Sequence, residues 1–303
     1  MALYPETPGE VLTFRPGEER PNLWRTSRRI FRFPPRPLIM GVLNVTPDSF
    51  YDGGRYLSPE DAVRQAERMV DEGADIIDIG GESTRPFSSP VDEREEIRRI
   101  LPVLKLIIRK FDLPISIDTY KSGVARITIE EGAEIINDIS ALRFDKGMAE
   151  TVATYRAGVV LMHIRGQPAD MQIETTYDDL LNEIASHLDS SLVRAERSGI
   201  SREHTVIDPG IGFGKKLEDN YRLIRSIPFF QRSGRPVMVG PSRKSFIWKI
   251  LGSTPEDSLE GTISASIFSY LYGADILRVH DVGAIRKALV IARRFVDEGK
   301  GES

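Results

Sequence analysis

Eight short apolar runs, each of four to six residues, recur from Pro37 onward and alternate with longer stretches of helical periodicity. The runs are Leu38–Leu43, Asp75–Ile79, Pro114–Thr119, Glu134–Ile139, Val159–Ile164, Thr205–Asp208, Pro236–Val239 and Asp275–Val279. Nearly continuous Ile, Val and Leu is typical of parallel strands that are buried on both faces. The alternation therefore predicts eight βα units, and it constrains the fold more than any other feature of the chain.

Eight such units in about 250 residues fit a closed (β/α)8 TIM barrel of the α/β class, whose active site lies at the C-terminal ends of the strands. An open, doubly wound sheet is the alternative, but Gly210–Gly214 is followed by Lys215 where the dinucleotide fingerprint requires Gly. We predict one barrel domain over residues 37–297 and a tail over 298–303. Residues 1–36 form an N-terminal extension, which we expect to close the bottom of the barrel as a hairpin.

One short template recurs at three helix-to-strand joints, Gly73–Asp78, Gly132–Asn137 and Gly273–Arg278. Each has a glycine, an apolar strand and a polar residue five positions after the glycine. Glycine is common where a helix ends, which explains the first position. It does not explain the polar residue, which we expect at the same end of each strand. Before the first joint, Ser58 and Pro59 predict a capped helix start.

Composition excludes several classes of function. The net charge is −4, which argues against a broad basic surface for nucleic acid or for an anionic membrane. We find no apolar run long enough to span a membrane and expect no secretory signal. Cysteine is absent, which excludes disulfides, thiolate catalysis and cysteine-ligated metals. We therefore expect a cytoplasmic enzyme that acts on small molecules.

Polar side chains collect at the predicted C-terminal ends of the strands. They are Asn44, Asp78, Asp118, Asn137, His163, Asp208, Lys244, Arg278 and His280. Any one of them has an ordinary explanation, because Asp or Asn after a strand is common loop and capping chemistry. Together they could bind a flat heterocycle that has several donors and acceptors. Unpaired burial would cost about 1–3 kcal/mol for each group, so a ligand is the natural partner.

A second group of residues is cationic and glycine-rich. Gly80–Pro86 follows the second strand, Ser242–Ser245 follows the seventh, and Arg278 and His280 end or follow the eighth. Backbone amides, hydroxyls and charged donors in this arrangement predict an oxyanion site, and loops after the last two strands of such barrels often bind phosphate. Taken alone, Ser242–Ser245 is equally typical of a solvated helix start.

The motifs together resemble the dihydropteroate synthase family. The matching segments, in order, are Gly41–Phe50 with Asp52–Gly54, Asp78–Pro86, Ser116–Thr119, Ile136–Asp138, Leu161–His163, Asp208–Lys215, Ser242–Ser245 and Arg278–Asp281. This resemblance implies the condensation of 6-hydroxymethyl-7,8-dihydropterin pyrophosphate with 4-aminobenzoate in folate biosynthesis. The products are 7,8-dihydropteroate and pyrophosphate. It also implies assistance by Mg²⁺, a homodimer, and inhibition by sulfonamides, which mimic 4-aminobenzoate.

The resemblance also assigns roles to single residues. Those expected to bind the pterin are Asp118, Asn137, Met162, Asp208 and Lys244. Those expected to bind pyrophosphate are Asn44, Arg278 and His280, with Asn44 also binding Mg²⁺. Those expected to frame 4-aminobenzoate are Thr84, Arg85, Pro86, Phe213, Lys244 and Ser245. The catalytic set is Asp118, Asp208, Lys244 and Arg85. We expect Asp78 to be a buried acid that supports the loop Gly80–Pro86. We expect His187 and His204 to have no role.

The implied reaction requires no protein nucleophile, because an aromatic amine displaces pyrophosphate from a methylene carbon. Cations and Mg²⁺ would stabilise the leaving group, and a carboxylate beside the pterin would favour positive charge in the ring. We therefore expect an SN1-like path. A pterin-dependent methyltransferase could share the barrel, but Thr84–Pro86 and Ser242–Ser245 favour the synthase. A catalytically idle homologue would be expected to have eroded loops, whereas both Asn44–Gly54 and Gly80–Pro86 are intact.

Overall fold

Eight parallel strands form the centre of the computed structural model, which describes residues 23–33, 36–46 and 58–298. The strands are β3 (Leu38–Asn44), β4 (Ile76–Gly80), β5 (Ile115–Asp118), β6 (Ile135–Asp138), β7 (Gly158–Met162), β8 (Thr205–Asp208), β9 (Met238–Val239) and β10 (Ile276–Val279). Their order is β8-β7-β6-β5-β4-β3-β10-β9. A parallel bridge between Ile207 and Val237 joins the two outer strands, so the sheet closes. The predicted barrel and its eight strands are confirmed.

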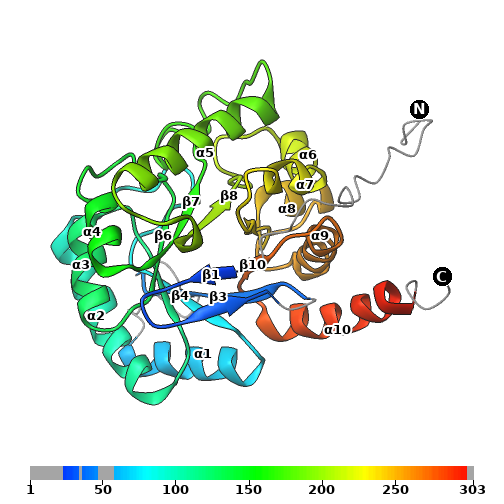
Figure 1. Cartoon of the computed structure of the whole chain (residues 1–303). Coiled ribbons are helices and arrows are strands. Elements are labelled where there is room, and N and C mark those ends of the chain that lie inside the picture. Colours follow the sequence, from blue (N-terminus) through cyan, green and yellow to red (C-terminus); the bar gives the residue numbers. More distant parts are fainter. Residues whose placement is uncertain (1–22, 34–35, 47–57, 299–303) are drawn as a thin grey trace, which may run out of the picture.

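Ten α-helices are described, and they form a ring around the strands (Figure 1). They are α1 (Pro59–Asp71), α2 (Glu93–Lys110), α3 (Ser122–Glu130), α4 (Met148–Tyr155), α5 (Leu180–Arg197), α6 (Leu217–Arg225), α7 (Ile227–Gln231), α8 (Ser245–Leu251), α9 (Leu259–Leu271) and α10 (Val282–Glu298). Helix α1 begins as predicted, because the Ser58 side chain accepts a hydrogen bond from the Asp61 amide. It ends before Gly73, whose φ of +92° suits glycine.

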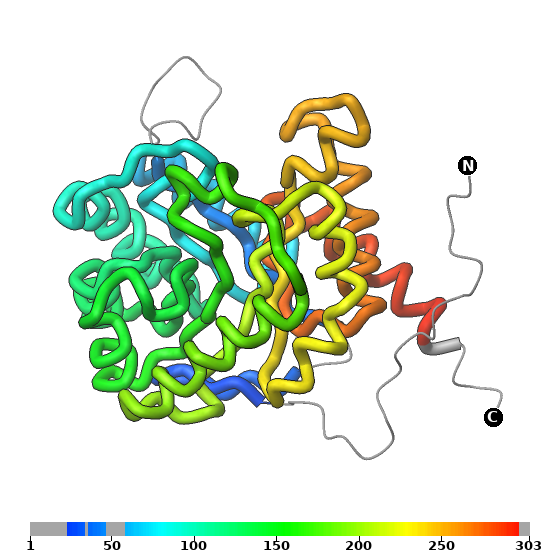
Figure 2. The backbone as a smooth tube through the Cα atoms, turned by 90° about the horizontal axis from the view of Figure 1, so that it is seen from above, coloured from blue at the N-terminus to red at the C-terminus, as the bar shows by residue number. Residues whose placement is uncertain are grey.

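A hairpin lies below the barrel. Strands β1 (Leu23–Arg25) and β2 (Ile30–Arg32) pair antiparallel, and Figure 2 shows them at the opposite end of the molecule from the loop after β4. Trp24 is fully buried against an apolar layer inside the barrel that includes Met40 and Val206, and its indole N–H donates to the His204 carbonyl. The hairpin thus closes the N-terminal end of the barrel. Residues 1–22 and 34–35 of the predicted extension, the motif residues 47–54 and the tail residues 299–303 lie outside the described residues.

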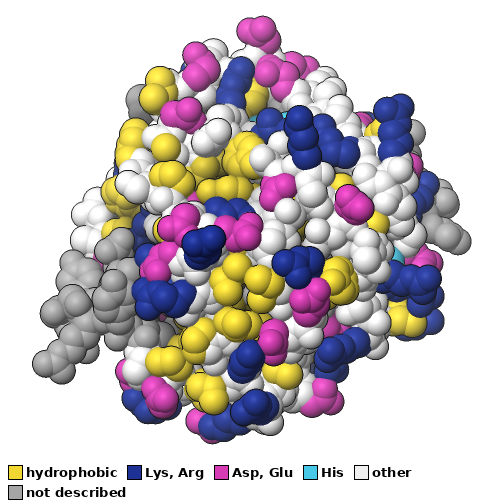
Figure 3. All heavy atoms as spheres, turned by 90° about the vertical axis from the view of Figure 1, so that its left-hand side faces the viewer, with side chains coloured by type: hydrophobic (Ala, Val, Ile, Leu, Met, Phe, Trp, Pro, Cys, Tyr) yellow, Lys and Arg dark blue, Asp and Glu magenta, His cyan; other side chains and the backbone are white. Residues whose placement is uncertain are grey.

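The surface carries both signs of charge. On the face shown in Figure 3, Lys and Arg side chains are interspersed with Asp and Glu. This agrees with the small net charge of the chain. In the part of the chain that the structure describes, no helix combines the length and the apolar character that crossing a membrane requires.

Candidate active site

The period of two along each strand places polar side chains above an apolar layer. Apolar residues of the inner layer at the bottom are Ile76, Ile135, Val160, Val206 and Ile276. The residues two positions further along the same strands are Asp78, Asn137, Met162, Asp208 and Arg278. All five therefore face the barrel interior near its C-terminal end, where enzymes of this architecture have their active sites.

Arg278 connects two acids across the barrel mouth. Its Nε donates to Asp78 Oδ2 at 2.6 Å, and its Nη2 donates to Asp118 Oδ2 at 2.7 Å. Asn137 Nδ2 also donates to Asp78 Oδ2, at 3.2 Å. Asp78 is fully buried, as expected. Its side chain, however, accepts hydrogen bonds from Arg278 and Asn137 and does not support the loop Gly80–Pro86, because its position in β4 points it into the barrel.

Several buried acceptors at this end have no partner among the described residues. They are Oδ1 of Asp78, Asp118 and Asn137, together with the hydroxyl of Ser116. Buried polar atoms in proteins are nearly always hydrogen-bonded, to protein or to water. A cluster of unpaired acceptors is what a ligand with several N–H donors would complete.

Burial shifts the acids and the lysine of the site toward neutrality. It raises the pKa of Asp208 to about 6, although the Gly210 amide donates to its carboxylate at 2.7 Å and opposes the shift. Burial also raises the pKa of Asp118, against the opposing charge of Arg278. It lowers the pKa of Lys244 to about 8. Groups perturbed in this way by burial and specific neighbours are typical of active sites.

Lys244 and Phe213 meet at the other side of the mouth. The Lys244 ammonium lies 4.0 Å from the centre of the Phe213 ring, within the range of a cation–π contact. Gly212 permits this approach, since its φ is +82° and a Cβ there would lie 3.1 Å from Lys244 Cδ. Lys244 is also the residue before α8, which begins at Ser245. Ser242–Ser245 thus leads into a helix, but it is not a solvated helix start, because Ser242 is buried.

His280 lies in the same region and is neutral at pH 7. Its Nδ1 is 3.0 Å from the Ser242 hydroxyl. Burial, together with the charges of Arg243 and Arg278, lowers the pKa of His280 to about 3. The resemblance assigns this residue to pyrophosphate, where it could act as a hydrogen-bonding group but not as a cation.

The loop after β4 carries Thr84, Arg85 and Pro86. Arg85 is exposed, and its charge adds to the effect of burial in lowering the pKa values of Lys244 and His280. The base of the loop is anchored by Glu82, which accepts a hydrogen bond from the Tyr120 hydroxyl at 2.7 Å and is ion-paired with Lys121.

Two groups of residues without an assigned role also belong to this end of the barrel. Lys215 is buried, and its ammonium lies 2.9 Å from His163 Nδ1 and donates to the Phe213 carbonyl at 2.8 Å. Its position at the end of the glycine-rich motif Asp208–Lys215 could have indicated, from the sequence alone, that it lies near the site. The other group is Glu82 and Lys121 with Glu96 of α2. These residues come from separate elements, and no sequence pattern marks their association.

Comparison with known proteins identifies the family to which this chain belongs. The profile of the pterin binding enzyme family matches residues 40–280. The dihydropteroate synthase of Synechocystis sp. is 43% identical over 264 residues, which cover 87% of this chain and 91% of that protein. The structure of Xanthomonas albilineans dihydropteroate synthase with 4-aminobenzoic acid matches with a TM-score of 0.85 and 40% identity, covering 92% of this chain and 99% of that one.

A second solved structure matches equally broadly. Burkholderia cenocepacia dihydropteroate synthase complexed with 7,8-dihydropteroate gives a TM-score of 0.84 at 36% identity, covering 93% of this chain and 99% of that one. Profile, sequence and structure thus agree over nearly the whole barrel. This chain belongs to the pterin binding enzyme family and, within it, to the dihydropteroate synthases.

Proposed function

We propose that this chain condenses 6-hydroxymethyl-7,8-dihydropterin pyrophosphate with 4-aminobenzoate to give 7,8-dihydropteroate and pyrophosphate. The observation that carries the proposal is the set of buried, unpaired acceptors at the barrel mouth, within the described residues, beside the Lys244–Phe213 contact. The relatives solved with 4-aminobenzoic acid and with 7,8-dihydropteroate support the same substrate and product. The intact motifs of both site loops favour the synthase over a pterin-dependent methyltransferase or an idle homologue.

The pterin would be held from inside the barrel. Asp118 and Asn137 offer unpaired oxygens to the amide and amino groups of the ring, with Asp208 beside them. Met162 belongs to a small apolar cluster that includes Phe213, and it would pack against the ring face. An apolar wall with a few oriented polar groups is the usual design of a small-molecule site.

The displacement breaks the bond between the methylene carbon and the pyrophosphate oxygen and forms a carbon–nitrogen bond to the amine, which then loses a proton to solvent. The carboxylates of Asp118 and Asp208 would stabilise positive charge in the pterin, and Arg278 would stabilise the departing anion. We propose an SN1-like path on this basis. A secondary isotope effect at the methylene clearly above unity would support it, and a value near unity would argue against it.

Magnesium assistance fits the residues present, provided that the substrate supplies most of its ligands. Among the described residues, no cluster of three or more His, Cys, Asp or Glu could hold a metal. Mg²⁺, however, commonly binds through one or two protein oxygens, waters and substrate phosphates. Asn44 could supply one oxygen, since it and Asp118 both flank Gly80 at the mouth. The ion would neutralise charge on the leaving pyrophosphate.

A homodimer is proposed from the apolar surface of α9 and α10. These neighbouring helices expose Phe268, Leu271, Val290, Ile291 and Phe295, of which Phe295 is 78% exposed. Adjacent exposed apolar side chains on helices favour contact with a second copy of the chain. Sedimentation of the wild type and of Ile291→Asp would test this, with a shift from dimer to monomer expected. The cytoplasmic location stays a prediction that cell fractionation would test.

The activity is tested directly by incubating the purified chain with both substrates and Mg²⁺ and detecting dihydropteroate by mass. We expect the wild type to form dihydropteroate, less of it when Mg²⁺ is chelated, and the Asp118→Asn variant to form none. Sulfonamides should inhibit by occupying the 4-aminobenzoate site. A folded wild-type protein that forms no product, or that transfers a methyl group from a methylated pterin instead, would overturn the proposal.

A further inference from the structure

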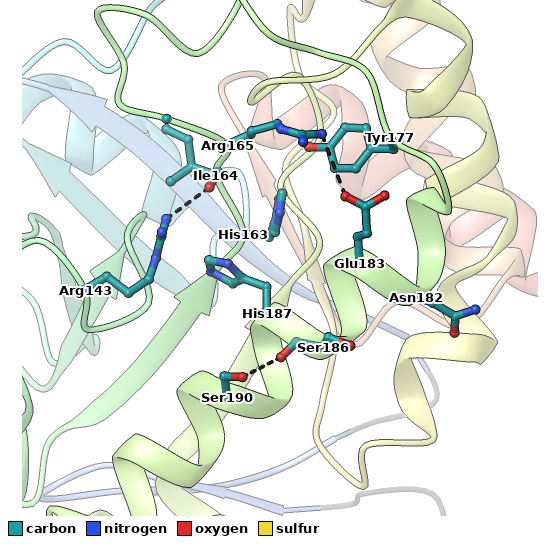
Figure 4. A pocket seen from close by; sticks show the side chains of 11 residues that line it. Arg143, His163, Ile164, Arg165, Tyr177, Asn182, Glu183, Ser186, His187 and Ser190 are labelled. Atoms are coloured by element: carbon teal, nitrogen blue, oxygen red, sulfur yellow. Dashed lines mark hydrogen bonds and ion pairs between the residues drawn. The ribbon is translucent and has the colours of Figure 1, made fainter.

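A cavity of about 590 Å³ lies on the helix side of β7, between α5 and the loop that follows the strand. Met162 faces the barrel interior, so the next residue, His163, points the opposite way and lines this cavity. The cavity is therefore separated from the barrel mouth by the wall of the barrel. Its side chains, shown in Figure 4, include Arg143, Arg165, Tyr177, Ser186 and His187. None of them is assigned to a substrate.

The positive charge at this cavity is only partly neutralised. Arg143 donates to two backbone carbonyls, those of Ser140 and Ile164, and neither carries a charge to oppose its own. Burial lowers the pKa of Arg143, and the charge of Arg194 lowers it further, whereas the charge of the buried Asp138 opposes both effects. On the other wall, Arg165 stacks on Tyr177 and is 3.9 Å from Glu183.

His187 presents an unused hydrogen-bonding atom. Its Nε2 is buried and has no partner among the described residues, and its ring packs edge-on against His163 at 4.6 Å. Burial, together with the charges of Arg143, Lys215 and Arg194, lowers the pKa of His187 to about 4. The ring is therefore neutral at pH 7, and Nε2 can donate a hydrogen bond in one of its tautomers.

We propose that this cavity binds a small molecule with a phosphate group, with the phosphate on Arg143 and His187 Nε2. A guanidinium and a neutral N–H donor are groups that recognise phosphate oxygens. The cavity is larger than phosphate requires, and its volume is in the range of sites for small organic ligands. The Tyr177 ring provides an apolar surface for the remainder of the ligand, and the exposed Ser186 lies at the side.

The test uses phenyl phosphate as the probe, which combines a phosphate with an aromatic ring, and inorganic phosphate as a second probe. Proton NMR of the full chain follows the imidazole resonance of His187, assigned through the His187→Gln variant. Millimolar phenyl phosphate should shift this resonance and raise the pKa of the ring, because the bound anion favours the protonated form. Phenol, which lacks the phosphate, should not shift it.

Ser186→Trp is the decisive variant, because an indole there would fill the cavity while replacing a surface side chain. Val193→Trp is its matched control, an exposed position on the same helix that does not line the cavity. Ser186→Trp should weaken phenyl phosphate binding about tenfold or more, whereas Val193→Trp should leave it unchanged. Both should unfold at the wild-type temperature and keep dihydropteroate formation. The proposal would be overturned if neither probe shifts the His187 resonance, or if phenyl phosphate shifts it equally in the wild type and in Ser186→Trp.

Discussion

The two ends of the barrel are built from the same strands and differ in what they leave unsatisfied. At the bottom, Ile76 and Val206 pack around Trp24, and even the indole N–H has a backbone acceptor. Two residues further up, Asp78 and Asp208 replace the apolar side chains. The upper layer holds acceptors without partners among the described residues. The lower end is thus complete as a folded core, whereas the upper end is completed only by a ligand.

The two ends therefore serve different purposes, stability at the bottom and ligand binding at the mouth. The apolar end stabilises the fold through burial, by roughly 25 cal/mol for each Å² of apolar surface removed from water. The polar end costs free energy until a ligand arrives, because desolvated acids are held close together. Substitutions at the bottom should therefore change stability alone. Substitutions at the mouth should change activity, and their effect on stability should depend on charge.

Arg278→Met should have the largest effect on both properties. The substitution leaves the Asp78 and Asp118 carboxylates buried without their cation. Removing one partner of a buried ion pair typically costs 3–5 kcal/mol, so we expect the free energy of unfolding, measured with urea, to fall by about that amount. Turnover should fall about 100-fold or more.

Arg36→Met provides a matched control at the opposite end of the barrel. Arg36 makes a bidentate pair with Asp75, and both residues are partly exposed to solvent. Because solvent reaches this pair, its loss should reduce the free energy of unfolding by less than Arg278→Met does, and the kcat should not change. Equal losses of activity in the two variants would contradict the division between the two ends.

Trp24→Ala should reduce stability without changing the chemistry. Loss of the fully buried indole leaves a cavity in the lower layer, and Trp→Ala changes in cores cost about 3–5 kcal/mol. Chemical denaturation measures the loss, and kcat should match that of the wild type at a temperature where the variant is folded. Trp24→Phe should recover part of the stability. A fall in kcat at unchanged stability would show that the bottom of the barrel also serves the site.

Much of this arrangement can be predicted from the sequence, because it follows from periodicity. Runs such as Leu38–Leu43 specify buried parallel strands, and their number specifies closure. The polar residue near the C-terminal end of each run, such as Asp78 or Asp208, specifies which end is the mouth. These inferences depend on short segments of the chain, in which the order of residues decides the local structure.

Contacts between distant segments could not be predicted in this way. Arg278 is matched to pyrophosphate by its motif, yet it is paired with Asp78, 200 positions away. The low pKa of His280 depends on burial and on neighbouring arginines, which no motif encodes. His187 shows no signal beyond its place on a helix, although its ring packs against that of His163 beside the cavity. Such features appear only when the strands and helices are brought together.

Asp208→Asn should remove a pH-dependent loss of folding stability that arises at the mouth. Because burial raises the pKa of Asp208 to about 6, the folded state holds this proton more tightly than the unfolded state. The wild type should therefore lose stability relative to the variant as the pH rises from about 4 to 6, by about 2 kcal/mol. Urea unfolding of both proteins at several pH values measures the difference. A difference that is constant with pH would show that the carboxyl group ionises freely in the folded protein.

Arg85→Ala should have the smallest effect, confined to one substrate. The side chain is exposed, so the free energy of unfolding should stay within about 0.5 kcal/mol of the wild type. Its charge acts on Lys244, which the resemblance also assigns to 4-aminobenzoate. The KM for 4-aminobenzoate should rise about tenfold, equivalent to 1.4 kcal/mol, with a smaller change for the pterin pyrophosphate. Steady-state kinetics with each substrate varied in turn separate the two. Unchanged 4-aminobenzoate kinetics would remove Arg85 from the site and leave Lys244 as the cation that this substrate meets.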